Sequence, residues 1–368
     1  MDYAKQYGQV DSKPTMIQRD VALASMTTLQ VGGAAEFFAD IYEEGALSAA
    51  VGWAKGKNLP ITVLGGGSNV LICDDGIPGL TIRLSIPGRH SRINGAAVDY
   101  SLGAGEDWDQ AVKHAVGQGW AGIECLAGIP GLAGAAPIQN IGAYGQDISQ
   151  TVLKVRVFSL SRNEFRDLSA LDCEFGYRQS RFKRASVPDE LVTRVTLRLA
   201  HGGAPTVAYK ELAQRVGQDP TLLQVLKTVQ ELRRQKSMLA NTPDGNHRSA
   251  GSFFLNPTLT PGAAEDLLAR CRTLGIKDED VPRWPSLNGD TKFAAAWLIE
   301  RSGLAKGYGD GPVGLSTNHT LAIVNRGGAS AGDILRFALH VRGKVEGVFG
   351  IALEPEPRAL GFDTPPFG

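Results

Sequence analysis

Residues 128–145 read GIPGLAGAAPIQNIGAYG, and this stretch decides the fold. It carries no charged side chain, it is rich in small residues, and it contains two prolines, Pro130 and Pro137. A strand inside a sheet does not accommodate prolines in this way, because proline cannot donate a hydrogen bond to a neighbouring strand. The pattern favours a backbone that wraps closely around a flat aromatic ligand. A buried structural loop is the alternative interpretation.

A second glycine-rich stretch, GGGSN at 65–69, directly follows an apolar segment expected to be a strand at 61–64. A strand that runs into a glycine-rich turn is a common way to hold a diphosphate with backbone N–H groups. The stretch is not a Rossmann fingerprint, which would need a glycine where Val70 stands, and no Walker A sequence occurs. Taken alone, it fits a hairpin turn as well as a phosphate site.

Composition limits the classes of protein to consider. The chain has 368 residues, which favours two or three domains. It has 38 basic and 38 acidic residues, so its net charge of zero gives no general attraction to nucleic acid or an anionic membrane. The longest uncharged stretch, 125–146, is broken by glycines and prolines and does not read as a membrane-spanning helix.

The start of the chain and its cysteines predict a soluble, cytoplasmic protein. The first residues are polar and show no apolar core of a signal peptide. The cysteines form no CxxC pair, so reduced thiols are a better interpretation than a metal site or a redox pair. They are Cys73, Cys125, Cys173 and Cys271.

Hydrophobic periodicity changes near the sequence HGGAP at 201–205, a plausible linker. Before it the pattern is β-rich, with strands expected at 61–64, 80–84, 152–159 and 191–199 and a helix at 109–116. After it the pattern is α+β, with helices expected at 222–232, capped by Thr221, at 294–302 and at 330–345, and with strands at 320–324 and 348–353.

Seven segments, in this order, resemble the UDP-N-acetylenolpyruvoylglucosamine reductases (MurB family). The resemblance covers nearly the whole chain, and the set is far more specific than any one member. The segments are TTL at 27–29 with Gly32 and Gly33, GGGSN at 65–69, GIPGLAGAAPIQNIGAYG at 128–145, FGYRQSRFK at 175–183, AGSFFLNP at 250–257, AAAWLIERSGL at 294–304 and LEPEPR at 353–358.

The resemblance implies an α+β fold with an N-terminal extension at 1–22, an FAD-binding domain of the vanillyl-alcohol-oxidase (PCMH) type at 23–200, and an α+β substrate-binding domain at 205–368. It implies non-covalent FAD, because the first glycine loop lacks the histidine to which covalent members of this fold attach the flavin. The expected FAD contacts are Gly65, Gly66, Gly67, Ser68, Asn69, Ile129, Pro130, Gly131, Gly134, Ala135, Gln139, Asn140, Gly142 and Tyr144.

The same resemblance implies a reaction in peptidoglycan precursor synthesis: NADPH-dependent reduction of UDP-N-acetylglucosamine enolpyruvate to UDP-N-acetylmuramate. NADPH would reduce FAD and leave, and the UDP-sugar would then take the same pocket. Hydride would pass from flavin N5 to C3 and a proton from Ser252 to C2. We expect a monomer with these small-molecule partners and no metal, nucleic acid or membrane partner. The sequence does not decide between NADPH and NADH.

Arg178, within FGYRQSRFK, matches the family's active-site arginine. A guanidinium binds a carboxylate with two parallel hydrogen bonds, and the substrate carries an enolpyruvyl carboxylate. Hydride addition at C3 pushes negative charge towards that carboxylate, so a fixed cation there stabilises the transition state more than the ground state. Without the resemblance, an exposed arginine beside Arg181, Lys183 and Arg184 would be the simpler interpretation.

Ser252 and Glu356 match the other two catalytic residues of the family. A serine hydroxyl is a weak acid, so its role requires polar neighbours that relay a proton. Glu356 would assist the serine or stabilise the intermediate, whereas Glu354, two residues earlier, would be structural. A turn serine and a solvated acidic pair are the alternatives.

Tyr177 and four more residues match substrate contacts of the family branch that has a tyrosine loop: Tyr209, Lys236, Asn256 and His319. Two departures bear on these contacts. Related sequences carry glutamine at the position of His319, and often lysine at that of Leu255.

Two other functions share parts of this pattern. A flavin oxidase or dehydrogenase acting on a sugar alcohol would use the FAD domain but would not need Ser252 or Glu356. A non-catalytic flavin- or nucleotide-binding module would need none of Arg178, Ser252 and Glu356 together.

Overall fold

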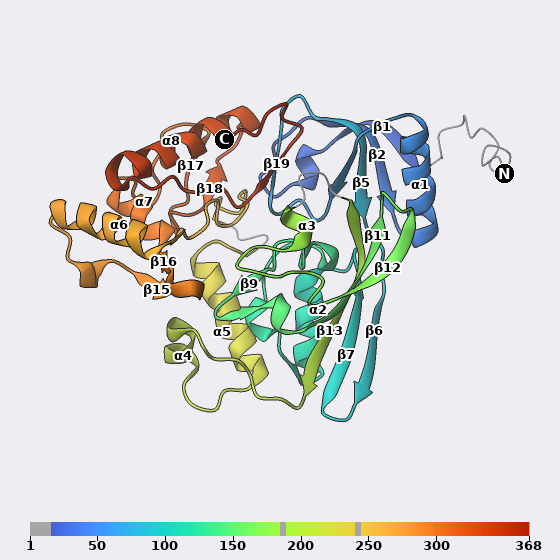
Figure 1. Ribbon diagram of the computed structural model, residues 1–368, viewed down its shortest axis with the longest axis horizontal. Coiled ribbons are helices and arrows are strands. Elements are labelled where there is room, and N and C mark those ends of the chain that lie inside the picture. Colours follow the sequence, from blue (N-terminus) through green and yellow to red (C-terminus); the bar gives the residue numbers. More distant parts are fainter. Residues whose placement is uncertain (1–15, 185–188, 240–243, 368) are drawn as a thin grey trace. The chain divides into compact units, whose positions relative to one another are not determined.

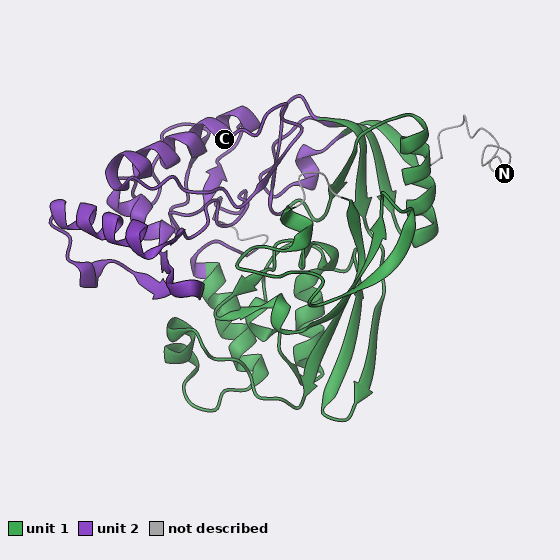
Figure 2. Cartoon of the chain, in the orientation of Figure 1, with its two compact units in different colours: residues 1–21, 35–67, 77–234 green, residues 22–34, 68–76, 235–368 purple. Residues whose placement is uncertain are grey.

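The computed structural model describes residues 16–184, 189–239 and 244–367 (Figure 1). The chain folds into two compact units, each built from separate stretches of sequence (Figure 2). Unit 1 comprises Met1–Val21, Ala35–Gly67 and Ile77–Arg234, and unit 2 comprises Ala22–Ala34, Ser68–Gly76 and Gln235–Gly368. Most of the expected N-terminal extension, residues 1–15, lies outside the described residues.

Unit 1 combines two larger sheets and the two-stranded β9-β10 sheet with several helices. Its elements are β1 (Ile17–Ala22), β2 (Ala34–Ile41), α1 (Glu44–Gly56), β3 (Ile61–Leu64), β5 (Ile77–Leu84), β6 (Arg89–Asn94), β7 (Ala97–Gly103), α2 (Trp108–Gly117), β8 (Trp120–Ala121), β9 (Gly142–Ala143), β10 (Gln146–Asp147), β11 (Val152–Ser159), β12 (Glu164–Ser169), α3 (Arg181–Arg184), β13 (Glu190–His201), α4 (Lys210–Val216) and α5 (Leu222–Gln235).

The first sheet has the strand order β1-β2-β5-β3, and β5 runs parallel to both β2 and β3. Parallel strands of one sheet need a crossover connection. Helix α1 supplies the connection from β2 to β3, the two strands that flank β5. Leu47, Ala50, Val51 and Ala54 of α1 recur at helical spacing and are fully buried. This packing ends β3 at a defined place, directly before the glycines at 65–67.

The second sheet is antiparallel, in the order β12-β11-β13-β7-β6, with β8 paired to the end of β13. Val155, Val195 and Leu102 lie opposite one another across its three central strands and are all fully buried. Apolar faces of α2 and α5 share the same core. Helix α2 begins at a capping aspartate, whose side chain accepts a hydrogen bond from the N–H of Gln110 at 2.8 Å.

Unit 2 gathers three stretches of chain around one core. Its elements are β4 (Val70–Ile72), β14 (Thr258–Leu259), α6 (Pro261–Thr273), β15 (Arg283–Pro285), β16 (Thr291–Phe293), α7 (Ala295–Arg301), β17 (Val313–Leu315), β18 (Ile323–Asn325), α8 (Ala331–Phe349) and β19 (Arg358–Leu360). The last strand, β19, pairs in parallel with β4. Asp74 accepts hydrogen bonds from the N–H groups of Ala331 and Gly332, so the β4 segment also holds the first turn of α8.

The expected strand at 348–353 is wrong. Helix α8 continues to Phe349, because its buried stripe extends through Val345 to that residue. Gly350 then ends the helix in the left-handed conformation, with φ 70° and ψ 18°. The strand expected at 320–324 is also misplaced, since β18 covers Ile323–Asn325 and Thr320 and Leu321 form a turn before it.

The compact units divide at a different place from the predicted boundary at 201–205. Unit 1 continues to Arg234 because Val225, Leu226, Val229 and Leu232 of α5 are buried in the core of the antiparallel sheet. The four cysteines are free thiols, three of them buried. Within the described ranges, no helix is long and apolar enough to cross a membrane.

Candidate active site

The two glycine stretches meet inside unit 1. A Cβ added at Gly66 would lie 2.9 Å from the Cα of Gly131, and one added at Gly65 would lie 3.2 Å from the Cβ of Ala135. The backbones therefore approach so closely that Gly66 leaves no room for a side chain. This contact brings together residues that the sequence placed in one cofactor site.

Backbone donors of the first turn fit a phosphate ligand. The turn of Gly65, Gly66 and Gly67 starts at the end of β3, and Gly67 has φ 65°. Over the described parts of the chain, no acceptor receives a hydrogen bond from the N–H groups of these three glycines. Successive unpaired amides in a concave turn suit a diphosphate such as that of FAD.

Helix α2 anchors the second glycine stretch. The side chain of Asp109 accepts a hydrogen bond from the N–H of Gly128 at 2.6 Å, and Gly131 accepts one from the N–H of Trp108 at 3.1 Å. A Cβ at Gly134 would lie 2.6 Å from that of Ala104. Contacts of its backbone with α2 and Ala104 thus fix the segment that contains Ile129, Pro130 and Ala135.

The end of this stretch has two left-handed residues that are not glycine, Asn140 with φ 47° and Tyr144 with φ 49°. The side chain of Asn140 is buried, donates to the carbonyl of Gly176 at 2.9 Å and accepts from the N–H of Ser149 at 3.1 Å. Burial raises the pKa of Tyr144 to about 12. Asn140 therefore holds the segment that contains Arg178. This structural role is additional to its predicted contact with the cofactor.

Arg178 lies against the same loop. Its guanidinium donates to the carbonyl of Asn140 at 3.1 Å and to that of Gly142, and a Cβ at Gly142 would lie 2.9 Å from the guanidinium. Arg178 itself is left-handed, with φ 52°, and its guanidinium carbon lies 5.6 Å from the ring centroid of exposed Tyr177. These hydrogen bonds orient the guanidinium against the loop.

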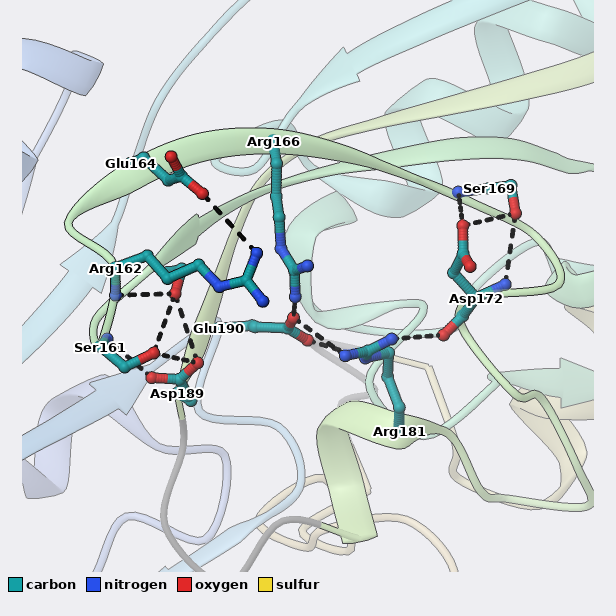
Figure 3. A network of polar contacts seen from close by, with 10 residues as sticks. Ser161, Arg162, Glu164, Arg166, Ser169, Asp172, Arg181, Asp189 and Glu190 are labelled. Atoms are coloured by element: carbon teal, nitrogen blue, oxygen red, sulfur yellow. Dashed lines mark hydrogen bonds and ion pairs between the residues drawn. The ribbon is translucent and has the colours of Figure 1, made fainter.

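Ion pairs hold the arginine segment from its other end. Figure 3 shows Glu190, at the start of β13, between the guanidinium groups of Arg166 and Arg181. Arg181 also donates to the carbonyl of Asp172 at 2.9 Å. The side chain of Glu190 is only 9% exposed, so its two ion pairs are partly shielded from solvent. Helix α3, which begins three residues after Arg178, is thereby tied to the sheet.

Tyr209 stands at the start of α4, also within unit 1. Its ring meets that of Tyr144 edge to face, with centroids 5.4 Å apart. Burial also raises the pKa of Tyr209, although part of its side chain is exposed. The structure therefore places the expected substrate tyrosine beside an expected cofactor residue.

In unit 2, the Ser252 and Glu356 segments run side by side. Phe254 and Pro355 form an antiparallel bridge. The N–H of Glu356 donates to the carbonyl of Phe253 at 2.8 Å, and the N–H of Leu255 donates to the carbonyl of Glu354 at 2.9 Å. Ser252 is half-buried and stands directly before the buried Phe253, the first residue of this ladder. Glu356 is half-buried and Glu354 exposed, which supports the choice of the second glutamate.

Asn69 fixes the backbone around Glu356. Its side-chain amide donates to the carbonyl of Glu356 at 3.2 Å, and its own carbonyl accepts from the N–H of Arg358 at 3.1 Å. Ser68 accepts a hydrogen bond from Thr28 at 3.4 Å. Both residues belong to unit 2, whereas the three glycines before them belong to unit 1.

Lys236 and His319 lie in one electrostatic environment. Desolvation, together with the charges of Lys236 and Lys306, lowers the pKa of His319 to about 4. A neutral imidazole beside ammonium groups suits an anionic ligand, because a phosphate meets positive charge there without an additional buried cation.

A polar network holds the neighbours of these two residues. Asp244 accepts hydrogen bonds from the side chain of Asn318 at 3.0 Å and from Ser237, which is buried and left-handed with φ 54°. Sequence reasoning missed Asp244, because a single acidic residue between two motifs carries no signal by itself. Asn256 was expected to meet substrate, and its side chain accepts a hydrogen bond from the N–H of Ala295 at 3.0 Å, at the start of α7.

The described residues show two groups. Unit 1 brings the glycine stretches together with Arg178, Tyr177 and Tyr209. Unit 2 pairs the segment after Ser252 with that of Glu356, sets Asn69 against the carbonyl of Glu356, and places Lys236 and His319 in one electrostatic environment. Among the missed residues, Arg233 donates to the carbonyl of Gly128 at 3.0 Å, and burial lowers its pKa. It lies one residue beyond the helix predicted at 222–232, and no motif marked it.

Two family models match the chain. The model of an FAD binding domain matches residues 37–167, and that of the UDP-N-acetylenolpyruvoylglucosamine reductase C-terminal domain matches residues 243–360. The first range contains both glycine stretches, and the second contains Ser252 and Glu356.

Similar proteins carry one name. The chain is 41% identical over 355 residues to the UDP-N-acetylenolpyruvoylglucosamine reductase of Thermobifida fusca, covering 94% of this chain and 99% of the relative. It is 40% identical to that of Streptomyces coelicolor, covering 95% and 91%. A crystal structure of the reductase from Thermus caldophilus matches with a TM-score of 0.63 and 27% identity, covering 94% of this chain and 98% of that one.

These matches confirm the predicted α+β class, with an FAD-binding domain of the vanillyl-alcohol-oxidase type followed by the reductase domain. They also confirm the predicted cofactors, FAD and the hydride donor NADPH. The chain belongs to the UDP-N-acetylenolpyruvoylglucosamine reductases, FAD-dependent oxidoreductases of peptidoglycan precursor synthesis.

Proposed function

We propose that this enzyme reduces the enolpyruvyl group of UDP-N-acetylglucosamine enolpyruvate to the lactyl group of UDP-N-acetylmuramate, with Ser252 as the proton donor to C2. The observation that supports the proposal is the ladder in unit 2, in which the residues directly after Ser252 pair with the segment that contains Glu356. A flavin oxidase would need neither residue, because it removes hydride from its substrate and protonates no carbon.

Ser252 and Glu356 form the acid of the proposed reaction. A serine hydroxyl releases its proton only when a neighbour can stabilise the oxygen or return a proton to it. The N–H of Glu356 donates to the carbonyl of Phe253, the residue after this serine, and Asn69 donates to the carbonyl of Glu356, which supports Glu356 as that neighbour. The pair therefore offers both a donor to C2 and a group that restores the donor.

Arg178 binds the carboxylate of the enolpyruvyl group. The carbonyls of Asn140 and Gly142 accept hydrogen bonds from its guanidinium and orient it. As charge develops on the carboxylate side of C2, the fixed guanidinium lowers the energy of that state without moving. Bound FAD would supply the redox chemistry, carrying hydride from NADPH to C3.

The remaining predicted contacts suit the UDP part of the substrate. Lys236 provides a cation for the diphosphate, and His319 stays neutral beside it. Asn256 and Tyr177 offer polar groups to the sugar. Tyr209 would cover the bound nucleotide from the start of α4. We include a cytoplasmic location in the proposal, supported by four free cysteines, which suit a reducing compartment.

One anaerobic absorbance experiment tests the proposal. The purified enzyme, reconstituted with FAD, is expected to lose its absorbance near the flavin maximum when NADPH is added. It is then expected to recover that absorbance when UDP-N-acetylglucosamine enolpyruvate is added without oxygen. Recovery only after air enters would instead identify a flavin oxidase, and no loss with NADPH would contradict the assignment of the donor.

Ser252→Ala tests the acid. Loss of a general acid slows a step by about 10²–10⁴-fold, so re-oxidation by the sugar substrate should slow by this factor while reduction by NADPH is unchanged. Ser91→Ala, at an exposed position in β6, is the matched control. Equal re-oxidation rates in the two variants would remove Ser252 from the mechanism. Glu356→Gln should slow the same step, and Glu354→Gln, the exposed neighbour, should not.

A further inference from the structure

We propose that Glu124 is a positioning residue that fixes the Tyr209 segment to the cofactor loop, and so sets the affinity for the sugar substrate without touching it. The inference rests on the proposed function in one respect, the role of Tyr209 in holding the substrate. The clamp itself is a property of unit 1 and can be measured without any substrate.

Glu124 is a fully buried carboxylate that has no catalytic assignment. Its Oε2 accepts a hydrogen bond from the N–H of Gly122 at 2.7 Å, and its Oε1 accepts one from the N–H of Thr206 at 2.6 Å and one from the side chain of Gln146 at 3.2 Å. No cation of the described chain pairs with it. Three neutral donors thus hold the group, an arrangement that must be nearly complete for a buried charge to be tolerated.

Thr206 is held by all three of its polar groups. Besides the N–H bound by Glu124, its hydroxyl accepts a hydrogen bond from the Gln146 side chain at 3.1 Å, and its carbonyl accepts one from the thiol of Cys125 at 3.2 Å. Gln146 in turn accepts a hydrogen bond from the N–H of Cys125 at 2.9 Å. Few loop residues are fixed so completely, and this one precedes Tyr209 by three positions.

The same contacts reach the cofactor stretch. Gln146 follows directly on GIPGLAGAAPIQNIGAYG, and a Cβ at Gly145 would lie 3.0 Å from that of Ala208. The ring of Tyr144 meets that of Tyr209 with centroids 5.4 Å apart. The clamp of Glu124, Gln146 and Thr206 therefore joins the loop expected to hold FAD to the tyrosine expected to hold the sugar nucleotide.

A glutamine in place of Glu124 weakens the clamp without changing its volume. All three neighbours are donors, so the new NH₂ group must face at least one of them, and the remaining oxygen is no longer charged. Hydrogen bonds to charged groups are the stronger kind. We expect Glu124→Gln to loosen residues 206–216 and to raise the KM for the UDP-sugar roughly tenfold. FAD content and the KM for NADPH should stay near the wild-type values.

Hydrogen exchange of the FAD-loaded enzyme, measured by mass spectrometry without substrate, tests the clamp first. Exchange in 206–216 should rise in Glu124→Gln and, to a smaller extent, in Thr206→Val, while exchange in α5 stays as in wild type. Glu164→Gln, a matched change at an exposed position in β12, should alter neither. A rise throughout unit 1 would show a general structural role and overturn the proposal, and so would unchanged exchange in 206–216.

A double-mutant cycle separates positioning from general support. If Glu124 acts through Tyr209, Glu124→Gln should raise the KM for the UDP-sugar in wild type but not further in Tyr209→Ala. Additive effects would overturn the proposal. If wild type fails to reduce the UDP-sugar at all, the proposed function fails, and the exchange experiment still decides whether the clamp exists.

Discussion

Replacing Gly66 by alanine tests whether the two glycine stretches form one cofactor cradle. The added Cβ would lie 2.9 Å from the Cα of Gly131 and 3.3 Å from the N of Leu132, where ordinary contact begins at 3.4 Å. Because these are backbone atoms, no flexible side chain can move aside. One stretch must shift by about 0.5 Å, the difference between 3.4 and 2.9 Å.

The energy of this shift follows from overpacking, which costs typically about 1–3 kcal/mol. If the loops relax apart in the free protein, FAD must bring them together again, and its Kd should rise about 5–150-fold. If they stay together, the same energy should appear as lost stability, at about 2–4 °C in Tm per kcal/mol for a unit of this size. The sum of the two effects should therefore fall near 1–3 kcal/mol.

The assay is titration of the apoprotein with FAD, followed by the quenching of flavin fluorescence, with a thermal melt of the apoprotein alongside. Gly52→Ala is the matched control, because Gly52 lies inside α1 with nothing within 4 Å of an added Cβ. It should raise stability by up to about 1 kcal/mol and leave FAD binding unchanged. A Gly66→Ala protein that binds FAD and melts like wild type would refute the reasoning.

Three further predictions concern charged groups. Arg178→Lys should slow re-oxidation by the sugar substrate about 10²-fold in stopped-flow traces and leave NADPH reduction intact, since lysine cannot form the bidentate pair; equal slowing of both steps would contradict this. Glu190→Gln should lower the free energy of unfolding by about 1–2 kcal/mol in urea titrations, because its pairs with Arg166 and Arg181 are largely but not fully shielded; an unchanged midpoint would contradict the anchoring role. The depressed pKa of His319 predicts that its contribution to the free energy of unfolding is fully present above about pH 6.5. This free energy should fall by at most ~1.4 kcal/mol per pH unit as the pH drops towards 4, because only the unfolded state takes up the proton there. His319→Gln should flatten this slope.

Local patterns predicted the elements that depend on local sequence. The strand expected at 152–159 is β11 (Val152–Ser159), because alternation of side chains is itself the pattern of a half-buried strand. Helix α5 begins after Thr221 as expected, whose hydroxyl accepts a hydrogen bond from the N–H of Gln224 at 3.2 Å. The strand predicted at 348–353 was wrong because a short apolar run fits a helix end as well as a strand.

The composition of the units could not be predicted in this way. Residues 68–76 join unit 2 because β4 pairs with β19, nearly the whole chain away, and because Asp74 holds the start of α8. Neither interaction leaves a periodic signal in the sequence. The helical residues 222–234 join unit 1 for a similar reason, since α5 buries its stripe against a sheet that is complete by residue 201.

The catalytic residues were recognisable as types, whereas their supports were not. Arg178, Ser252 and Glu356 stand in motifs that resemble those of the family, and this resemblance, together with the chemistry of their side chains, pointed to their predicted roles. Glu124 and Asp244 accept hydrogen bonds from groups far along the chain, such as the N–H of Thr206 and the side chain of Asn318, and these pairings leave no pattern in the sequence. Supports of this kind become visible only when the chain is folded.

The GGGSN turn shows how one motif can serve two purposes. The sequence assigned all five residues to the cofactor, but its glycines belong to unit 1 and Ser68 and Asn69 to unit 2. The backbone donors of the three glycines suit a diphosphate. Asn69 instead uses its amide on the carbonyl of Glu356 and its carbonyl on the N–H of Arg358. We therefore propose that Asn69 positions Glu356, in addition to its predicted contact with FAD, and that replacing it slows protonation of the sugar substrate.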